Sequence, residues 1–347
     1  MFRKGVIHTM KIICSKSSLL KSVSIALKAV PSKTTMPILE CILMDATTNQ
    51  IKFTTNDMEL GIETIVEGTI EEKGKVALDA KIFYEIIRRL PDNDITIKTD
   101  DKYAATITCE KAKFNIPGKS GEDFAYLPMI EKDEPLTISQ YTLKEMIRQT
   151  IFSIAVNENN KLMTGELFEI KNNCLKVVSL DGHRIAIRKM PLKKDYSDRK
   201  VVVPGKTLSE VSKILSGEVD DQVSIYFTKN HILFEFDQTM VVSRLIEGEY
   251  FRIDQMLSSD YETKLKINKK EFLDCIDRAT LLVREVDKKP IIINITDDDM
   301  ELRIDSAMGS MNEEIDIEKE GKDIMIGFNP KFLIDALRVI DDETVTI

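Results

Sequence analysis

The segment DAKIFYEIIRRLPDNDITI, residues 79–97, recurs twice along the chain. Its counterparts are PGKTLSEVSKILSGEVDDQVSI at residues 204–225 and NPKFLIDALRVIDDETVTI at residues 329–347. The three copies begin at positions 79, 204 and 329, a constant spacing of 125 residues. Each copy combines a helical apolar pattern, an acidic turn and an alternating strand. A period this long exceeds the roughly 20–50 residues of solenoid repeats and indicates a domain repeated in tandem.

The elements around these copies also repeat. A short strand and an amphipathic helix open each unit, strands rich in β-branched residues follow, and the quoted segment comes next. The expected domains are residues 10–128, 136–258 and 263–347, with residues 1–9 as an N-terminal extension. The third domain is expected to be C-terminally incomplete, since the first two copies continue into further strands. The pattern predicts an α+β fold in which two helices per domain pack on antiparallel sheets.

Specific elements follow from the apolar spacing and the turn residues. The predicted helices are residues 15–30, 79–90, 140–154, 204–215, 269–283 and 329–340. Predicted strands in the first domain are residues 10–15, 38–45, 51–55, 60–67, 76–78, 95–99, 104–109 and 113–116. Strands at residues 136–139 and 264–268 open the second and third domains.

Length and composition restrict the class of protein. A chain of 347 residues accommodates two or three domains. No apolar run reaches the roughly 18 residues of a membrane span, and residues 1–9 lack the apolar core of a signal peptide. The five cysteines are scattered without a CxxC pair, which favours reduced cytosolic thiols over a disulfide framework or a zinc site.

The charge distribution is uneven. The chain has a formal net charge of −9, yet the six predicted helices carry +7 by counting Lys and Arg against Asp and Glu. The remainder therefore carries −16. This segregation is compatible with a basic helical face that meets nucleic acid. It is equally compatible with ordinary amphipathic helices whose lysines are solvated.

Two short motifs are candidate chemical sites. Gly118-Lys119-Ser120 resembles the end of a phosphate loop, but Lys113 occupies the position of the loop's first glycine and the segment leaves a strand. Residues 181–184, DGHR, admit a reading in which Asp181 orients His183 as a general base. The other reading is a tight turn between strands at residues 177–180 and 185–188 that shapes a surface pocket. No partner motif for catalysis accompanies it.

These features together resemble a known family. The threefold domain order, LDGHRIAIRKMP at residues 180–191, TTMPILECILM at residues 34–44 and IMIGFNPKFLIDAL at residues 324–337 are similar to the bacterial sliding clamp, the beta subunit of DNA polymerase III. The resemblance implies a cytoplasmic, noncatalytic accessory subunit of the polymerase holoenzyme. It further implies a head-to-tail homodimeric ring around duplex DNA, without sequence specificity, metal, cofactor or membrane contact.

The resemblance also implies functional residues. A peptide-binding cleft between the second and third domains would take apolar motifs from the replicative polymerase, the clamp loader, other polymerases and mismatch-repair proteins. Its residues would be Met163, Leu180, Gly182, His183, Arg184, Ile185, Met256, Asn329 and Phe332, with Arg184 at the rim. The DNA-facing residues would be Lys21, Lys28, Lys33, Lys144, Asn157 and Lys161. The dimer interface would use Lys111, Lys113, Leu281, Leu282, Glu313 and Glu314.

An alternative remains from the sequence. If the third domain is incomplete, the ring could fail to close, and the chain would then act as a protein-binding scaffold that does not encircle DNA.

Overall fold

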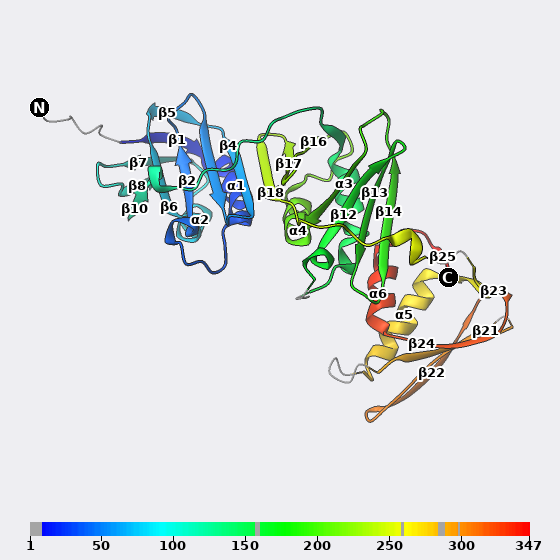
Figure 1. The fold of residues 1–347 in the computed structure, drawn as a ribbon. Coiled ribbons are helices and arrows are strands. Elements are labelled where there is room, and N and C mark those ends of the chain that lie inside the picture. The colour runs from blue at the N-terminus through cyan, green and yellow to red at the C-terminus, as the bar shows by residue number, and fades with distance from the viewer. Residues whose placement is uncertain (1–8, 157–159, 258–259, 284–288, 298) are drawn as a thin grey trace, which may run out of the picture. The chain divides into compact units, whose positions relative to one another are not determined.

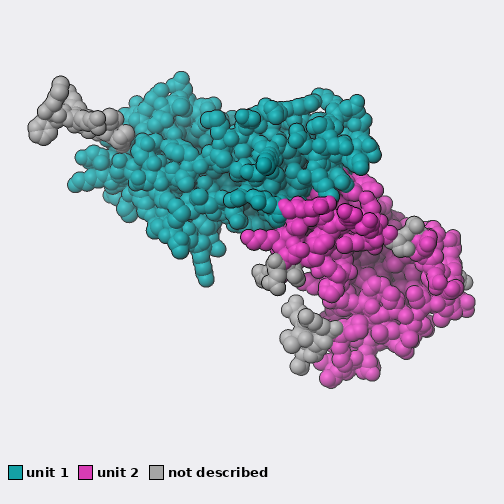
Figure 2. All heavy atoms as spheres, viewed as in Figure 1, with its two compact units in different colours: residues 1–147, 168–175, 191–247 teal, residues 148–167, 176–190, 248–347 magenta. Residues whose placement is uncertain are grey.

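The computed structural model describes residues 9–156, 160–257, 260–283, 289–297 and 299–347, and its ribbon is drawn in Figure 1. By contacts, the chain divides into two compact units, shown in Figure 2. One comprises residues 1–147, 168–175 and 191–247, and the other comprises residues 148–167, 176–190 and 248–347. The central part of the chain therefore contributes to both units.

The first repeat contains two α-helices and ten strands. Its elements are β1 (Lys11–Ser15), α1 (Lys16–Ala26), the 3-10 helices η1 (Leu27–Ala29) and η2 (Pro37–Glu40), β2 (Cys41–Asp45), β3 (Ile51–Asn56), β4 (Leu60–Val66), β5 (Thr69–Glu72), β6 (Lys75–Asp79), α2 (Ala80–Arg89), β7 (Asp94–Thr99), β8 (Ala105–Cys109), β9 (Ala112–Ile116), β10 (Gly118–Ser120) and η3 (Gly121–Asp123).

The second repeat follows the same order. Its elements are β11 (Leu136–Ser139), α3 (Gln140–Arg148), η4 (Ile151–Ser153), η5 (Lys161–Thr164), β12 (Gly165–Lys171), β13 (Cys174–Leu180), β14 (Ile185–Pro191), β15 (Arg199–Pro204), α4 (Gly205–Ile214), β16 (Gln222–Phe227), β17 (His231–Phe236), β18 (Thr239–Arg244) and η6 (Ile253–Gln255).

The third repeat is the shortest of the three in the described chain. Its elements are β19 (Thr263–Asn268), α5 (Lys269–Thr280), β20 (Ile291–Thr296), β21 (Asp299–Ser306), β22 (Gly309–Asp316), β23 (Glu318–Gly321), β24 (Ile324–Phe328), α6 (Pro330–Val339) and β25 (Thr344–Thr346).

Sheet topology shows the repeat most directly. The first repeat has strand orders β5-β1-β7-β8-β9 and β10-β6-β2-β3-β4. The third repeats these orders as β23-β19-β25 and β24-β20-β21-β22, and the second as β11-β16-β17-β18 and β15-β12-β13-β14. Every registered strand pair in the described residues is antiparallel. The expected combination of helices with antiparallel sheets is confirmed.

The sheets of the first and second repeats join into a single nine-stranded sheet. Strand β4 pairs with β18 in antiparallel register, with Thr64 opposite Thr239 and Leu60 opposite Ser243. The two threonine hydroxyls lie 2.9 Å apart, and Lys206 forms an ion pair with Asp57 beside the joint. Two edge strands thereby satisfy each other's backbone groups, which removes exposed edges from both repeats.

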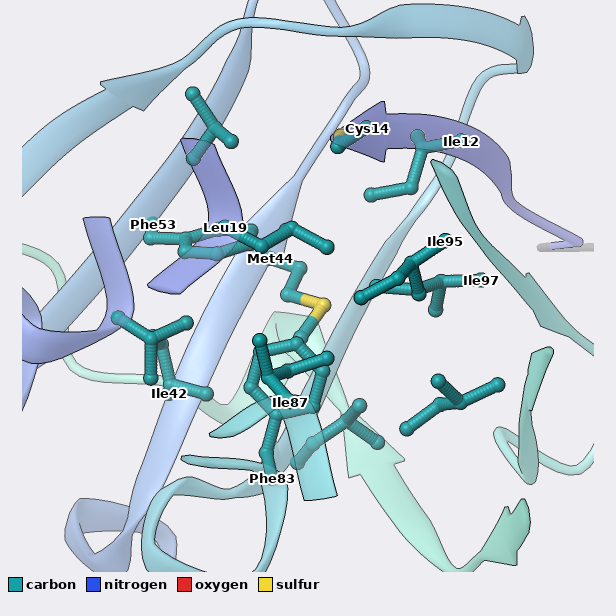
Figure 3. Close-up of a cluster of buried hydrophobic side chains, with 14 of the residues drawn as sticks. Ile12, Cys14, Leu19, Ile42, Met44, Phe53, Phe83, Ile87, Ile95 and Ile97 are labelled. Atoms are coloured by element: carbon teal, nitrogen blue, oxygen red, sulfur yellow. The ribbon is translucent and has the colours of Figure 1, made fainter. Parts of the chain in front are cut away.

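The core of the first repeat lies between its two sheets and its two helices. Figure 3 shows Ile12, Ile95 and Ile97 from one sheet facing Met44 and Phe53 from the other. Leu19 of α1 and Phe83 and Ile87 of α2 complete this cluster. The apolar residues at three- and four-residue spacing in the sequence are therefore the residues that the helices bury. The third repeat builds an equivalent cluster around Phe272, Ile293 and Leu302.

Several boundaries differ from the sequence-based expectation. The predicted strand at residues 38–45 begins at Cys41, because Pro37 at the first helical position favours the 3-10 turn Pro37–Glu40. The helix predicted over residues 140–154 ends at Arg148, since the backbone turns away from helical geometry at Thr150, with φ −128°. The helix predicted over residues 269–283 ends at Thr280. Strands β5 and β10 were not predicted.

Strand β10 explains the phosphate-loop-like tripeptide at residues 118–120. It pairs with β6, with Gly118 opposite Leu78, so its backbone groups are used in a sheet. A Cβ atom at Gly118 would lie 2.3 Å from the carbonyl oxygen of Tyr103. The glycine is thus required by close backbone approach.

Candidate functional site

The DGHR tetrapeptide forms the turn between β13 and β14. Gly182 has a φ of +85°, a left-handed conformation that glycine adopts without strain. The carboxylate of Asp181 accepts hydrogen bonds from the backbone N–H of His183 at 3.0 Å and of Arg184 at 3.2 Å. This side-chain-stabilised turn fixes the positions from which His183 and Arg184 project.

Arg184 is anchored in the site by all three nitrogens of its guanidinium group. Nε donates to Asp181 at 3.0 Å, Nη1 donates to Asp335 of α6 at 2.9 Å, and Nη2 donates to the carbonyl of Phe152 at 2.6 Å. Its side chain is only 15% exposed. Arg184 therefore lies within the site as a bridging residue, whereas the sequence suggested a free cation at the rim.

Two aromatic rings lie against this guanidinium. Its central carbon lies 5.2 Å from the ring centre of Phe152 and 4.6 Å from that of Phe332, within cation–π range. The imidazole of His183 stacks on Phe332, with ring centres 5.7 Å apart and planes at 27°. The exposed His183 ring and the half-buried Phe332 ring thus present a flat, mainly apolar surface.

The other predicted cleft residues lie on neighbouring segments. Leu180 is buried at the end of β13, and Ile185 begins β14. Met163 lies in η5, where its carbonyl accepts a hydrogen bond from Ala155 N–H at 2.8 Å. Met256 follows η6 and is 53% exposed. Asn329 caps α6, its side chain accepting from Lys331 N–H at 3.0 Å.

Sequence reasoning missed two members of this cluster, Phe152 and Asp335. Asp335 lies three residues after Phe332 on a predicted helix, so the two share a face. That spacing was a signal that could have identified it. Phe152 had no such signal, because its carbonyl and ring reach Arg184 only after α3 ends and the chain turns through η4.

The geometry does not support the general-base reading of residues 181–184. Both carboxylate oxygens of Asp181 are engaged, one by the turn backbone and the other by Arg184. The ring of His183 contacts Phe332. Asp181 therefore orients an arginine and a turn.

Each repeat also contains a lysine that ties its two helices together. Lys16 of α1 donates to the carbonyl of Leu90, the C-cap of α2. Lys144 of α3 donates to the carbonyl of Leu215 at 3.2 Å, and Lys269 of α5 to that of Ile340 at 2.8 Å. A cation at a helix C-terminus satisfies an unpaired carbonyl and complements the helix dipole. Lys144 thus has a structural contact besides its predicted DNA-facing role.

The other predicted DNA-facing lysines have different surroundings. Lys21 lies on α1, Lys28 on η1, Lys33 in the following loop and Lys161 on η5. Within the described ranges, none of these four ammonium groups has a hydrogen bond or an ion pair with a carboxylate. They are free to meet phosphate groups. Asn157 lies outside the described residues.

The predicted dimer residues lie on edge strands and at one helix end. Lys111 and Lys113 are exposed at β9, the edge of its sheet, and Glu313 and Glu314 lie on edge strand β22. A hydrogen bond from Arg278 holds the pKa of Glu313 below its usual range. Glu314 is exposed and unpaired among the described residues. Leu281, just after α5, is 74% exposed, and Leu282 is half-buried beside it.

Glu166 is a buried carboxyl group on β12. It has no exposed surface, and burial raises its pKa to about 8. Burial likewise raises the pKa of the Cys14 and Cys275 thiols to about 12. Those cysteines are therefore neutral, unreactive thiols near neutral pH.

Comparison with protein families matches three models along the chain. Residues 10–128 match the N-terminal domain of the DNA polymerase III beta subunit, residues 137–251 its central domain and residues 254–347 its C-terminal domain. The beta sliding clamp of Staphylococcus aureus is 34% identical over 331 residues, covering 92% of this chain and 88% of that protein.

Solved structures give the same result. A chain from Eubacterium rectale described as a DNA polymerase III beta subunit is 70% identical, with a TM-score of 0.95. The DNA polymerase sliding clamp of Bacillus subtilis is 33% identical, with a TM-score of 0.94. In both cases 97% of this chain and 92% of the other chain are covered.

Three tandem domains of this topology define the class of noncatalytic processivity factors of DNA polymerases. The chain belongs to the DNA polymerase III beta subunit family, the bacterial sliding clamps. The resemblance inferred from the sequence is thereby confirmed, and the scaffold alternative is not favoured.

Glu166 generates a prediction about pH. Because its pKa is about 8 when folded and ordinarily 4.5, the folded chain retains a proton that the unfolded chain loses in this interval. The free energy of unfolding should therefore fall as pH rises between these values, by up to about 1.4 kcal/mol per pH unit. Replacing Glu166 with Gln should remove this contribution, so thermal midpoints of variant and parent should diverge toward pH 8.

The control is Glu131→Gln, which neutralises an exposed carboxylate and should keep the parental pH dependence. If the thermal midpoints of the Glu166→Gln variant and the parent change with pH in the same way, Glu166 is not a neutral, buried carboxyl group.

Proposed function

We propose that two copies of this chain close head to tail into a ring around duplex DNA, which the ring holds without reading sequence. The antiparallel pairing of β4 with β18 is the observation that supports this proposal, because it shows how the sheets of two repeats join edge to edge. By strand order, β22 occupies in the third repeat the place of β4, and β9 occupies in the first repeat the place of β18. By analogy with the β4–β18 pairing, we propose that β22 of one copy pairs with β9 of another.

Charge supports this pairing. The β9 segment carries exposed Lys111 and Lys113, whereas β22 carries Glu313, Glu314 and Asp316. Opposite charges on paired edges favour the correct partner and register. Leu281 and Leu282 add apolar surface beside β22. Each interface of a head-to-tail ring would contain one such strand pair.

The unpaired lysines supply the proposed DNA surface. Contacts from Lys21, Lys28, Lys33 and Lys161 to phosphates add electrostatic affinity that is independent of base sequence. We place Asn157 and Lys144 on the same surface, as the resemblance implies. The acidic remainder of the chain repels DNA from other faces, so retention is topological and sliding remains possible.

The stacked site around Phe332 is the proposed peptide cleft. Its apolar rings, together with Met163 and Met256, which we assign to the same cleft, suit apolar side chains of several partners, since methionine adapts its shape. We propose as partners the replicative polymerase catalytic subunit, the clamp loader, other polymerases and mismatch-repair proteins. We further propose a cytoplasmic location. In the portion of the chain that the structure describes, no helix is long and apolar enough to cross a membrane.

The ring proposal predicts retention that depends on DNA topology. Clamp loaded on nicked circular DNA should stay bound through gel filtration, whereas clamp on the same DNA after linearisation should be lost, because an open end releases a ring. Equal retention on both forms at moderate salt would rule out encirclement.

The interface proposal predicts a charge-reversal pattern. Lys113→Glu should weaken the dimer by about tenfold in sedimentation velocity, since it places like charges on paired strands. Adding Glu314→Lys to the same chain should restore much of the dimer, because each interface then contains a reversed pair. The control is Lys81→Glu, at an exposed position on α2, and it should leave the dimer unchanged. If Glu314→Lys fails to restore the dimer, Lys113 and Glu314 do not face each other across the interface.

The cleft proposal predicts loss of peptide binding. Met163→Asp combined with Phe332→Ala should abolish binding of a labelled peptide that contains Leu and Phe, measured by fluorescence anisotropy. Met129→Asp makes the same chemical change at a methionine that is 98% exposed, and should have no effect. If the peptide affinity of the double variant stays within about threefold of the parent, a binding free-energy difference of ~0.7 kcal/mol, the peptide does not bind at this site.

A further inference from the structure

We propose that Asp335 is a positioning residue of the peptide cleft, which acts by holding Arg184 so that Phe332 and His183 present their rings to the peptide. This inference rests on the proposed function of the cleft. Asp335 does not belong to the residue set that the sequence suggested, and it contacts the guanidinium on which Phe332 packs.

The first argument is the geometry of the guanidinium group. Asp335 accepts from Nη1 at 2.9 Å, while Asp181 and the Phe152 carbonyl accept from the other two nitrogens. The planar fork of arginine allows these three bonds to fix its orientation as well as its position. Without Asp335, the contact between the guanidinium and α6 would consist only of the face of Phe332.

The second argument is helical spacing. Phe332 and Asp335 are three residues apart on α6, so they project from the same face toward Arg184. The helix therefore makes a polar and an aromatic contact with one group. Pairwise contacts then link Phe152, Arg184, Phe332 and His183 in one cluster. Rotation or displacement of α6 would disturb both contacts at once.

The third argument is burial. The side chains of Arg184 and Asp335 are 15% and 24% exposed, so water screens the pair less than a surface ion pair. Removal of the Asp335 charge leaves a half-buried cation with one fewer partner, which is unfavourable. Nη1 of Arg184 would then hydrogen-bond to water or to a carboxylate of the peptide. In the parent, Asp335 occupies that position, so the cleft favours apolar side chains.

The test measures affinity and stability separately. Asp335→Asn should raise the Kd of a fluorescein-labelled peptide containing Leu and Phe by about fivefold or more in anisotropy titrations. Asp335→Glu should restore affinity because it returns the carboxylate. Asp341→Asn is the matched control: it breaks the more exposed ion pair with Arg148 beyond α6 and should leave Kd within about twofold.

A double-variant cycle tests whether Asp335 acts on peptide binding through Arg184. If Asp335 acts through Arg184, then Asp335→Asn should have no further effect on Kd in an Arg184→Gln background. An undiminished effect in that background would overturn the inference, as would a loss of affinity that Asp335→Glu fails to restore. A thermal midpoint that falls no more than in Asp341→Asn excludes general unfolding as the cause.

Phe332→Ala separates this inference from the function on which it rests. Lost binding in Phe332→Ala with unchanged binding in Asp335→Asn would overturn the positioning role and leave the cleft in place. Unchanged binding in Phe332→Ala would overturn both.

Discussion

The antiparallel pairing of β4 with β18 is the contact on which the larger architecture depends. Backbone groups of two edge strands satisfy one another, and two repeats thereby share a nine-stranded sheet. An edge strand left open invites association with another chain. In this molecule the corresponding edges, β9 and β22, carry opposite charges. In the proposed ring, these two open strand edges pair with each other between copies, and this pairing closes the ring.

A second recurring contact concerns the helices. In every repeat a lysine of the first helix donates to the C-cap carbonyl of the second, at Leu90, Leu215 and Ile340. These carbonyls belong to the segments that align at a period of 125 residues. The excess of positive charge in the helices therefore has two uses. Some lysines hold helix pairs together, and others, such as Lys21 and Lys28, have no partner in the described chain and suit phosphate contacts.

The proposed peptide cleft illustrates how a charged residue can support an apolar surface. Arg184 binds two carboxylates and a carbonyl, so its charge is neutralised within the protein. Its flat faces then support aromatic rings, one of which, Phe332, stacks with His183. In the proposed cleft, peptide recognition would depend on the positions of the rings, and the ion pairs of Arg184 would help to fix those positions.

The sequence by itself determined the threefold repeat, the six helices, most strands and the family, because periodicity and turn chemistry are local properties. It misplaced the ends at Cys41, Arg148 and Thr280, where Pro37, the turn at Thr150 and the packing of the chain override the apolar pattern. It also assigned Arg184 and Phe332 to one candidate site, which stays a prediction. Only the tertiary structure decided that Asp335 and Phe152 contact Arg184, and that the Arg184 side chain is mostly buried among these partners. Contacts between residues 32 and 151 positions apart depend on how α6 and η4 pack, which no local pattern encodes.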